Sequence, residues 1–143
     1  MKKVLLIIIL AVLLSGCSKS TILPTREITI NGKTLTVEVA QTNQARSQGL
    51  SGRESLCDSC GMLFIFNTSA QYSFWMKDMN FPLDLIWLKN GVVQEITLDL
   101  PKPLGNELPA QVTPKSQIDA VLEVRAGQAK ALGIEIGQKI EGI

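Results

Sequence analysis

Histidine is missing from this 143-residue chain. Because histidine is the commonest catalytic base, its absence excludes a Ser-His-Asp or Cys-His arrangement within one chain. The three cysteines, Cys17, Cys57 and Cys60, are also too few for a zinc site, which usually takes four ligands. We therefore predict neither a metal site nor a cofactor. Any chemistry must use carboxylates, lysine, arginine, tyrosine or thiols.

Excess charge and long apolar runs are lacking as well. The 14 Lys and Arg nearly balance the 13 Asp and Glu, so the sequence indicates no basic patch that would bind nucleic acid. The longest N-terminal apolar run, Val4 to Leu14, is too short to span a bilayer, which takes roughly 20 apolar residues. The length suits a single domain.

The N-terminal residues have the pattern of an export signal. Lys2 and Lys3 are followed by the apolar run and then by Leu14-Ser15-Gly16-Cys17. This order resembles the bacterial lipobox, in which the cysteine is acylated and becomes the first residue after cleavage. The alternatives are an ordinary secretory signal with an incidental cysteine, and a short anchor that is never cleaved.

An acylated Cys17 would determine where the protein works. We expect residues 1–16 to be a signal peptide, residues 17–25 an acylated cysteine and tether, and residues 26–143 a single β-rich domain. The protein would then be exported and lipid-anchored at the outer or plasma membrane, on the periplasmic or extracellular side. Two or more acyl chains hold stably in a bilayer, so the membrane is an expected partner.

Alternating β-formers and turn signals dominate the rest of the chain. Asn31-Gly32 and Asn90-Gly91 are hairpin turn signals. Thr42 to Gln48 suits a short helix with Thr42 as N-cap and Gly49 as the residue after its end, and Ala126 to Leu132 suits another. We expect strands at 26–30, 34–39, 62–66, 72–77, 83–88, 92–98, 120–124, 134–136 and 139–140.

The order of these elements indicates the fold class. Strands outnumber helices, the helices are too short to cover a sheet, and the order is not a βαβ alternation. Residues 100–114 contain four prolines and are expected to form a long loop. We therefore predict a mainly β fold, a compact sandwich or barrel with one or two short helices.

Several ordered motifs connect the chain to a known family. They are GLSGRESL (49–56), GMLF (61–64), SFWMK (73–77), PLDLI (82–86), VLE (121–123), AG (126–127) and LGIEIG (132–137). The pattern resembles the domain of unknown function 192 family from about Leu35 to Ile140. The resemblance implies a β-rich, jelly-roll-like sandwich or barrel, often secreted or membrane-attached, and implies no established activity.

Two positions depart from the pattern of that family. Cys57-Asp58-Ser59-Cys60 stands where the family usually has a polar loop without cysteine. Asp78 stands where the family favours asparagine after the lysine. A role that depends on that asparagine therefore does not carry over to this chain.

Cys57 and Cys60 leave three interpretations open. Export would place them in an oxidising compartment, where a disulfide that closes the loop is the default. A redox-active pair is the second, although such pairs usually lie at a helix N-terminus and here an apolar, strand-like run follows. Metal ligation is the third, and it would need Asp58 or a second chain to complete the site.

Asp84 is a carboxylate in an otherwise apolar strand. Such a group must be paired, hydrogen-bonded or protonated. If residues 73–77 and 84–88 form a hairpin, Lys77 faces Asp84 directly. Asp84 is therefore a structural ion-pair partner, a carboxylate that braces a loop, or a weak candidate for a catalytic residue.

Trp75 and Arg53 are the other candidates for a binding site. Trp75 would lie beside Lys77, and exposed aromatic side chains next to polar groups suit flat ligands such as sugars. The alternative is that Trp75 and Trp87 both belong to the core. Arg53, with Glu54, suits either an anionic ligand or a brace for its own loop.

The favoured function is a non-enzymatic, lipid-anchored envelope module. It would bind a glycan, a protein or a small ligand near Arg53, Trp75, Lys77 and Asp84. Its oligomeric state is not indicated by the sequence.

Two alternatives come from other functional classes. One is a carboxylate-dependent enzyme acting on an envelope glycan or small molecule, in which Asp84 works with a second carboxylate such as Asp78, Asp99 or Glu123. The other is a thiol redox protein that uses Cys57 and Cys60.

Overall fold

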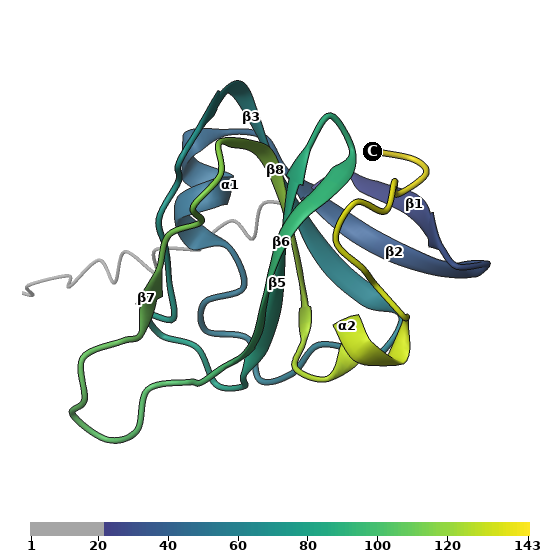
Figure 1. The fold of residues 1–143 in the computed structure, drawn as a ribbon. Coiled ribbons are helices and arrows are strands. Elements are labelled where there is room, and N and C mark those ends of the chain that lie inside the picture. The colour runs from purple at the N-terminus through teal and green to yellow at the C-terminus, as the bar shows by residue number, and fades with distance from the viewer. Residues whose placement is uncertain (1–21) are drawn as a thin grey trace, which may run out of the picture.

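The computed structural model of the chain describes residues 22–143 and confirms a mainly β fold (Figure 1). The predicted signal peptide and Cys17 lie outside the described residues. A six-stranded sheet and a two-stranded ribbon form the framework, with one short helix between the second and third strands and another after the last strand. No helix within residues 22–143 is long and apolar enough to cross a membrane.

The large sheet has the strand order β1-β2-β3-β8-β5-β6. All neighbouring strands are antiparallel except β2 and β3, which are parallel. Its strands are β1 (Thr25–Ile30), β2 (Lys33–Ala40), β3 (Cys60–Ala70), β5 (Leu83–Lys89), β6 (Val92–Leu100) and β8 (Ile118–Arg125). The ribbon pairs β4 (Phe74–Trp75) with β7 (Gln111–Val112), and the helices are α1 (Asn43–Gln48) and α2 (Gln128–Ala131).

Local sequence signals account for the turns and the first helix. Asn31 and Asn90 have φ values of 50° and 52°, and the glycine that follows each also has a positive φ, as the tightest hairpin turns require. The Thr42 hydroxyl accepts a hydrogen bond from the Ala45 amide at 3.1 Å, and Gly49 follows α1 with a φ of 50°. The predicted caps of α1 are therefore confirmed.

Three expectations about the strands are wrong. β2, α1 and β3 form one parallel βαβ unit, which the order of sequence patterns does not reveal. The strand expected at 72–77 is reduced to β4, and it pairs with β7 rather than with β5. The strands expected at 134–136 and 139–140 are replaced by two isolated bridges, Thr29 with Glu141 and Val92 with Lys139.

The sheet does not close into a barrel, because β1 and β6 remain its edges. Instead, the C-terminal segment 137–143 runs between the two edges. The Thr29 amide donates to the Glu141 carbonyl at 3.1 Å, and the Val93 amide donates to the Gln138 carbonyl at 2.9 Å. Irregular chain thus satisfies edge groups that would otherwise be free to pair with another molecule.

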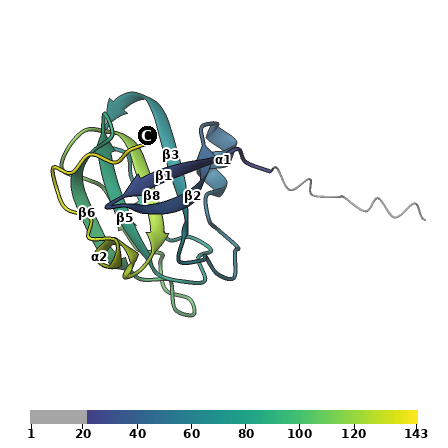
Figure 2. The same ribbon diagram turned by 90° about the vertical axis from the view of Figure 1, so that its right-hand side faces the viewer.

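The two faces of the sheet carry separate apolar clusters. The first cluster, which includes Ile86 and Leu122, is covered by α2 and the C-terminal segment. The second cluster, which includes Met62 and Trp87, is covered by α1, the loop 49–56 and the segment 72–81. Figure 2 shows α1 and α2 on opposite sides of the sheet.

Candidate functional site

The ribbon formed by β4 and β7 presents one apolar and one polar face. Phe74 lies opposite Val112, and Trp75 lies opposite Gln111. Phe74 and Val112 pack against the second cluster. The Phe74 ring meets the Trp87 ring edge-on, with 5.4 Å between centroids. These contacts hold the ribbon firmly on the core.

The opposite face of the ribbon is exposed. Trp75 is 58% exposed, and the Lys77 Nζ lies 5.3 Å from the centroid of its ring, within the range of a cation–π contact. The hydroxyls of Ser73 and Thr113 are 2.6 Å apart. We call this surface the ribbon platform; its exposed residues are Ser73, Trp75, Lys77, Gln111 and Thr113.

The loop 49–56 is joined to the segment that carries the platform. The Ser51 hydroxyl donates to the Lys77 carbonyl at 2.9 Å, and the Gly52 amide donates to the Asp78 carbonyl at 2.8 Å. The Asn80 side chain donates to the Arg53 carbonyl at 2.9 Å. The structure therefore brings the segments of Arg53, Trp75 and Lys77 together.

Arg53 is already engaged by a carboxylate. Its guanidinium donates to the two oxygens of Glu38 at 2.5 and 2.8 Å. The hydrogen bond from Arg53 lowers the pKa of Glu38, and the same bond raises the pKa of Arg53. Both side chains are about one-third exposed. Arg53 therefore braces its loop against β2, and Glu38 is the partner that the sequence pattern did not indicate.

Asp78 has a physical explanation for its departure from the family pattern. Its φ of 56° lies in the left-handed region. Aspartate and asparagine tolerate this conformation best among residues other than glycine. Exchange of one for the other therefore keeps the turn that presents Lys77.

Asp84 does not pair with Lys77, so that expectation is wrong. Asp84 is completely buried and lies on the face of the first cluster, where it accepts hydrogen bonds from two backbone amides. One is the Asp99 amide at 2.9 Å, in a β6 bulge where Asp99 has a φ of 54°. The other is the Ala129 amide at 3.0 Å, in the first turn of α2, whose N-cap Gly127 has no capping side chain. Asp84 thus secures a bulge and a helix start.

The geometry gives Asp84 no route to a substrate. Both oxygens are occupied and none of the side chain is exposed. Trp87 is also core, with its indole nitrogen donating to the Thr97 hydroxyl at 2.9 Å. The four candidates therefore do not share one surface, because only Arg53, Trp75 and Lys77 lie on adjoining segments.

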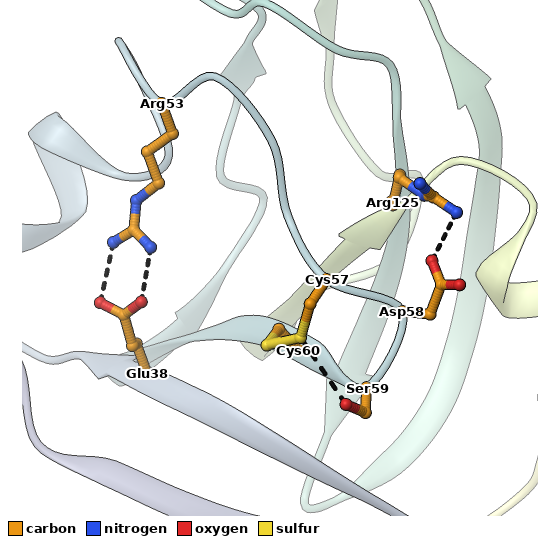
Figure 3. The surroundings of a disulfide bond; sticks show 7 residues. All are labelled: Glu38, Arg53, Cys57, Asp58, Ser59, Cys60 and Arg125. Carbon is orange, nitrogen blue, oxygen red and sulfur yellow. Dashed lines mark hydrogen bonds and ion pairs between the residues drawn. A yellow bond between two sulfur atoms is a disulfide. The ribbon is translucent and has the colours of Figure 1, made fainter.

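The predicted disulfide between Cys57 and Cys60 is present, with 5.0 Å between the Cα atoms. It closes a turn in which the Cys60 amide donates to the Cys57 carbonyl at 3.1 Å. Figure 3 shows the disulfide between two ion pairs, Arg53 with Glu38 and Arg125 with Asp58. The disulfide turn is therefore flanked by an ion pair on each side.

Glu123 is the second buried carboxyl of the described residues, and its environment is the reverse of that of Asp84. It is 6% exposed and lies between Met62 of β3 and Leu85 of β5. Within residues 22–143 no hydrogen bond or ion pair reaches its carboxyl group. Burial raises its pKa to about 8. In the sequence, Glu123 shares the feature that marked Asp84: it is a carboxylate flanked by apolar residues.

The candidate residues form no metal-binding group within residues 22–143, and they do not line the surface pocket that lies elsewhere on the sheet. Among residues 22–143 no group of three or more histidine, cysteine or carboxylate side chains is placed to hold a metal ion. A shallow hollow of about 290 Å³ lies at another end of the sheet. Its lining includes Phe66, Asn67, Asn90 and Asp119.

The comparisons identify the class of protein. Residues 26–142 match the domain of unknown function 192, described as an uncharacterized ACR. The chain therefore belongs to this family. A search of curated proteins gave no match.

Two solved structures are similar over most of their length. A chain from Sinorhizobium meliloti 1021, described as a proposed transcription regulator, is 34% identical, with a TM-score of 0.70 over 82% of this chain and 91% of that one. A protein of unknown function from Novosphingobium aromaticivorans DSM 12444 is 28% identical, with a TM-score of 0.73 over 86% of this chain and 89% of that one. These relatives support the fold and assign no reaction to it.

The structural role of Asp84 predicts a large loss of stability in Asp84→Asn. The amide nitrogen of asparagine cannot accept a hydrogen bond, so one buried backbone amide loses its partner. We expect the free energy of unfolding in urea to fall by about 2–3 kcal/mol.

Asp119→Asn is the matched control. Asp119 is only half-buried and accepts a single donor, the Asn90 amide, on both oxygens. An amide oxygen can still accept that bond, so the expected loss is below about 0.5 kcal/mol. Equal losses for the two variants would contradict the assigned role of Asp84.

Proposed function

We propose that the protein is an exported, lipid-anchored accessory module of the cell envelope that binds a glycan on the ribbon platform. The observation that carries this proposal is the exposed Trp75 indole on a ribbon whose opposite face is packed on the core. The indole is 58% exposed, so its flat face is available to stack on a ligand without a change in the fold.

The surroundings of Trp75 favour a sugar over a purely apolar ligand. The indole offers a flat surface for the C–H face of a sugar ring. Ser73 and Thr113 supply hydroxyls, Gln111 an amide and Lys77 an ammonium group, all exposed around the ring. Such groups exchange hydrogen bonds with sugar hydroxyls at little cost in desolvation.

The lipid anchor would hold this surface near a membrane. Leu23 packs against the second cluster, whereas Ile22 is 93% exposed. An acylated Cys17 would be six residues from Leu23, a separation that spans at most about 20 Å when extended. The ribbon platform packs on the same cluster as Leu23, so a glycan of the nearby envelope surface is the ligand class we favour.

Trp75→Ala tests the ribbon platform. The purified full-length protein, solubilised in detergent, is applied to an array of envelope and cell-wall oligosaccharides. We expect one sugar class to bind, and Trp75→Ala to weaken its binding by about thirtyfold, as for a tryptophan anchor worth about 2 kcal/mol.

Leu98→Ala is the matched control, because Leu98 is also 58% exposed but lies on β6. It should bind as the unaltered protein does. The proposal is contradicted if no oligosaccharide binds, or if loss of Trp75 and loss of Leu98 have the same effect.

The lipid anchor is tested by mass spectrometry of the protein extracted from membranes. We expect an N-terminal peptide that begins at Cys17 and carries a diacylglyceryl group. Cys17→Ser should leave the signal segment uncleaved and the cysteine modification absent. An unmodified N-terminus at another residue would contradict the anchor, without affecting the test of the ribbon platform.

A further inference from the structure

The Cys57–Cys60 disulfide has one accessible and one sheltered sulfur. Cys57 is exposed, whereas Cys60 is half-buried and packs against the second cluster. Cys60 begins β3, so its position is set by the sheet. The two sulfurs therefore face different surroundings, solvent for one and the edge of the core for the other.

The buried Glu123 lies on the same face as Cys60. Met62 pairs with Glu123, and the same register extended along β3 and β8 places Cys60 opposite Arg125. A Cβ added to Gly61, between Cys60 and Met62, would meet Val37 and Leu122 of the first cluster. The Cys60 side chain therefore points to the second cluster, as a diagonal neighbour of Glu123 at about 7–8 Å between Cα atoms.

Charged side chains lie on both sides of the Cys57–Cys60 disulfide. Arg125 forms an ion pair with Asp58 inside the disulfide turn, and Arg53 holds Glu38 on the far side of it (Figure 3). Lys77 and Asp78, from the segment packed above the sheet, are exposed. Glu123 is thus a largely buried acid on this face; because no fully enclosed side-chain oxygen within residues 22–143 lacks a hydrogen-bond partner, its carboxyl group lies at the edge of solvent.

The surroundings of the Glu123 carboxyl group differ from those of Asp84. The group is largely buried, so its charged form would lose most of its hydration. Asp84 shows that this fold can satisfy a buried carboxylate fully with backbone amides. The carboxyl group of Glu123 instead remains protonated at neutral pH, because burial raises its pKa to about 8.

We propose that Cys57–Cys60 exchanges with the dithiol of an envelope protein, and that Glu123 transfers a proton to and from Cys60. The choice of an envelope protein as partner rests on the proposed export of this protein, whereas the exchange itself is separate from glycan binding by the ribbon platform. Asp84, on the other face of the sheet, takes no part in it.

The reaction balances with a partner dithiol as the reductant. A partner thiolate attacks the Cys57 sulfur, the disulfide breaks, and Cys60 leaves as a thiolate that takes the proton of Glu123. A second partner thiolate then attacks the partner sulfur bound to Cys57 and releases Cys57 as a thiolate. The partner gains a disulfide, and this protein gains two thiols and a Glu123 carboxylate. Of the two partner protons, one goes to Cys57 and the other to solvent.

The charges on either side suit these steps. The guanidinium of Arg125 lies beside the turn and favours a thiolate that forms there. In the reverse direction, the Glu123 carboxylate accepts the proton of Cys60 as Cys60 attacks the mixed disulfide at Cys57. A proton exchanged at a fixed position speeds such steps without an added base.

Reduction of the full-length protein by dithiothreitol tests the role of Glu123. Free thiols are trapped with an alkylating reagent at successive times, from pH 5 to 9, and counted by mass spectrometry. We expect Glu123→Gln to slow reduction at pH 7 by about tenfold or more. The ratio of the two rates should approach one above pH 8, where Glu123 of the unaltered protein has lost its proton.

Glu135→Gln is the matched control, since Glu135 is exposed and follows α2 on the other side of the sheet. It should reduce at the rate of the unaltered protein at every pH. Glutamine keeps the size of the side chain and the neutral form that Glu123 has at pH 7, so folding is expected to be retained. A Cys57→Ser, Cys60→Ser double variant reports any background from Cys17.

The site of attack is tested with single cysteine variants and glutathione disulfide. Cys60→Ser, which leaves Cys57 free, should form the mixed disulfide about ten times faster than Cys57→Ser, because Cys57 is the exposed sulfur. The proposal is overturned if Glu123→Gln behaves as Glu135→Gln does across the pH range. It is also overturned if dithiothreitol leaves the disulfide closed, or if the two single variants react at equal rates.

Discussion

The central strand β8 imposes the main constraint on this fold. It has β3 on one edge and β5 on the other, and an apolar cluster covers each face of the sheet around it. A side chain on β5 or β8 must therefore enter an apolar layer whichever way it points. The short helices, the loop 49–56 and the C-terminal segment are all arranged to cover these two faces.

Two carboxyl groups meet this constraint in opposite ways. Asp84 faces the first cluster and is satisfied by two backbone amides, so it ties α2 and the β6 bulge to the sheet. Glu123 faces the second cluster with no partner in the described residues, and burial raises its pKa. One group therefore serves the architecture, and the other keeps a proton available beside the disulfide turn.

The sequence predicted the local structure better than the pairing of distant segments. The two hairpin turns and the start of α1 depend on interactions within a few residues, so short motifs predict them. These motifs are Asn31-Gly32, Asn90-Gly91 and Thr42. The sequence pattern also placed Trp75 beside Lys77, as the structure has it, but left open whether Trp75 belonged to the core. It could not show that β4 pairs with β7, because that partner follows a long, proline-rich loop.

The partners of the candidate side chains were harder to predict for a related reason. Asp84 binds backbone amides 15 and 45 residues away, and backbone groups have no signature in the sequence. The ion pairs of Arg53 and Arg125 likewise cross between a strand and a loop. The ribbon platform and the disulfide turn lie on the same side of the sheet, and only the tertiary fold reveals this.

The proposed exchange at the Cys57–Cys60 disulfide depends on the protonation state of Glu123. Its side-chain carboxyl can be followed by ¹³C NMR as pH is raised, with the disulfide intact. The structure predicts a midpoint near 8, because burial disfavours the charged carboxylate. A midpoint near the ordinary value of 4.5 would show that water or a partner reaches the group, and would contradict the account.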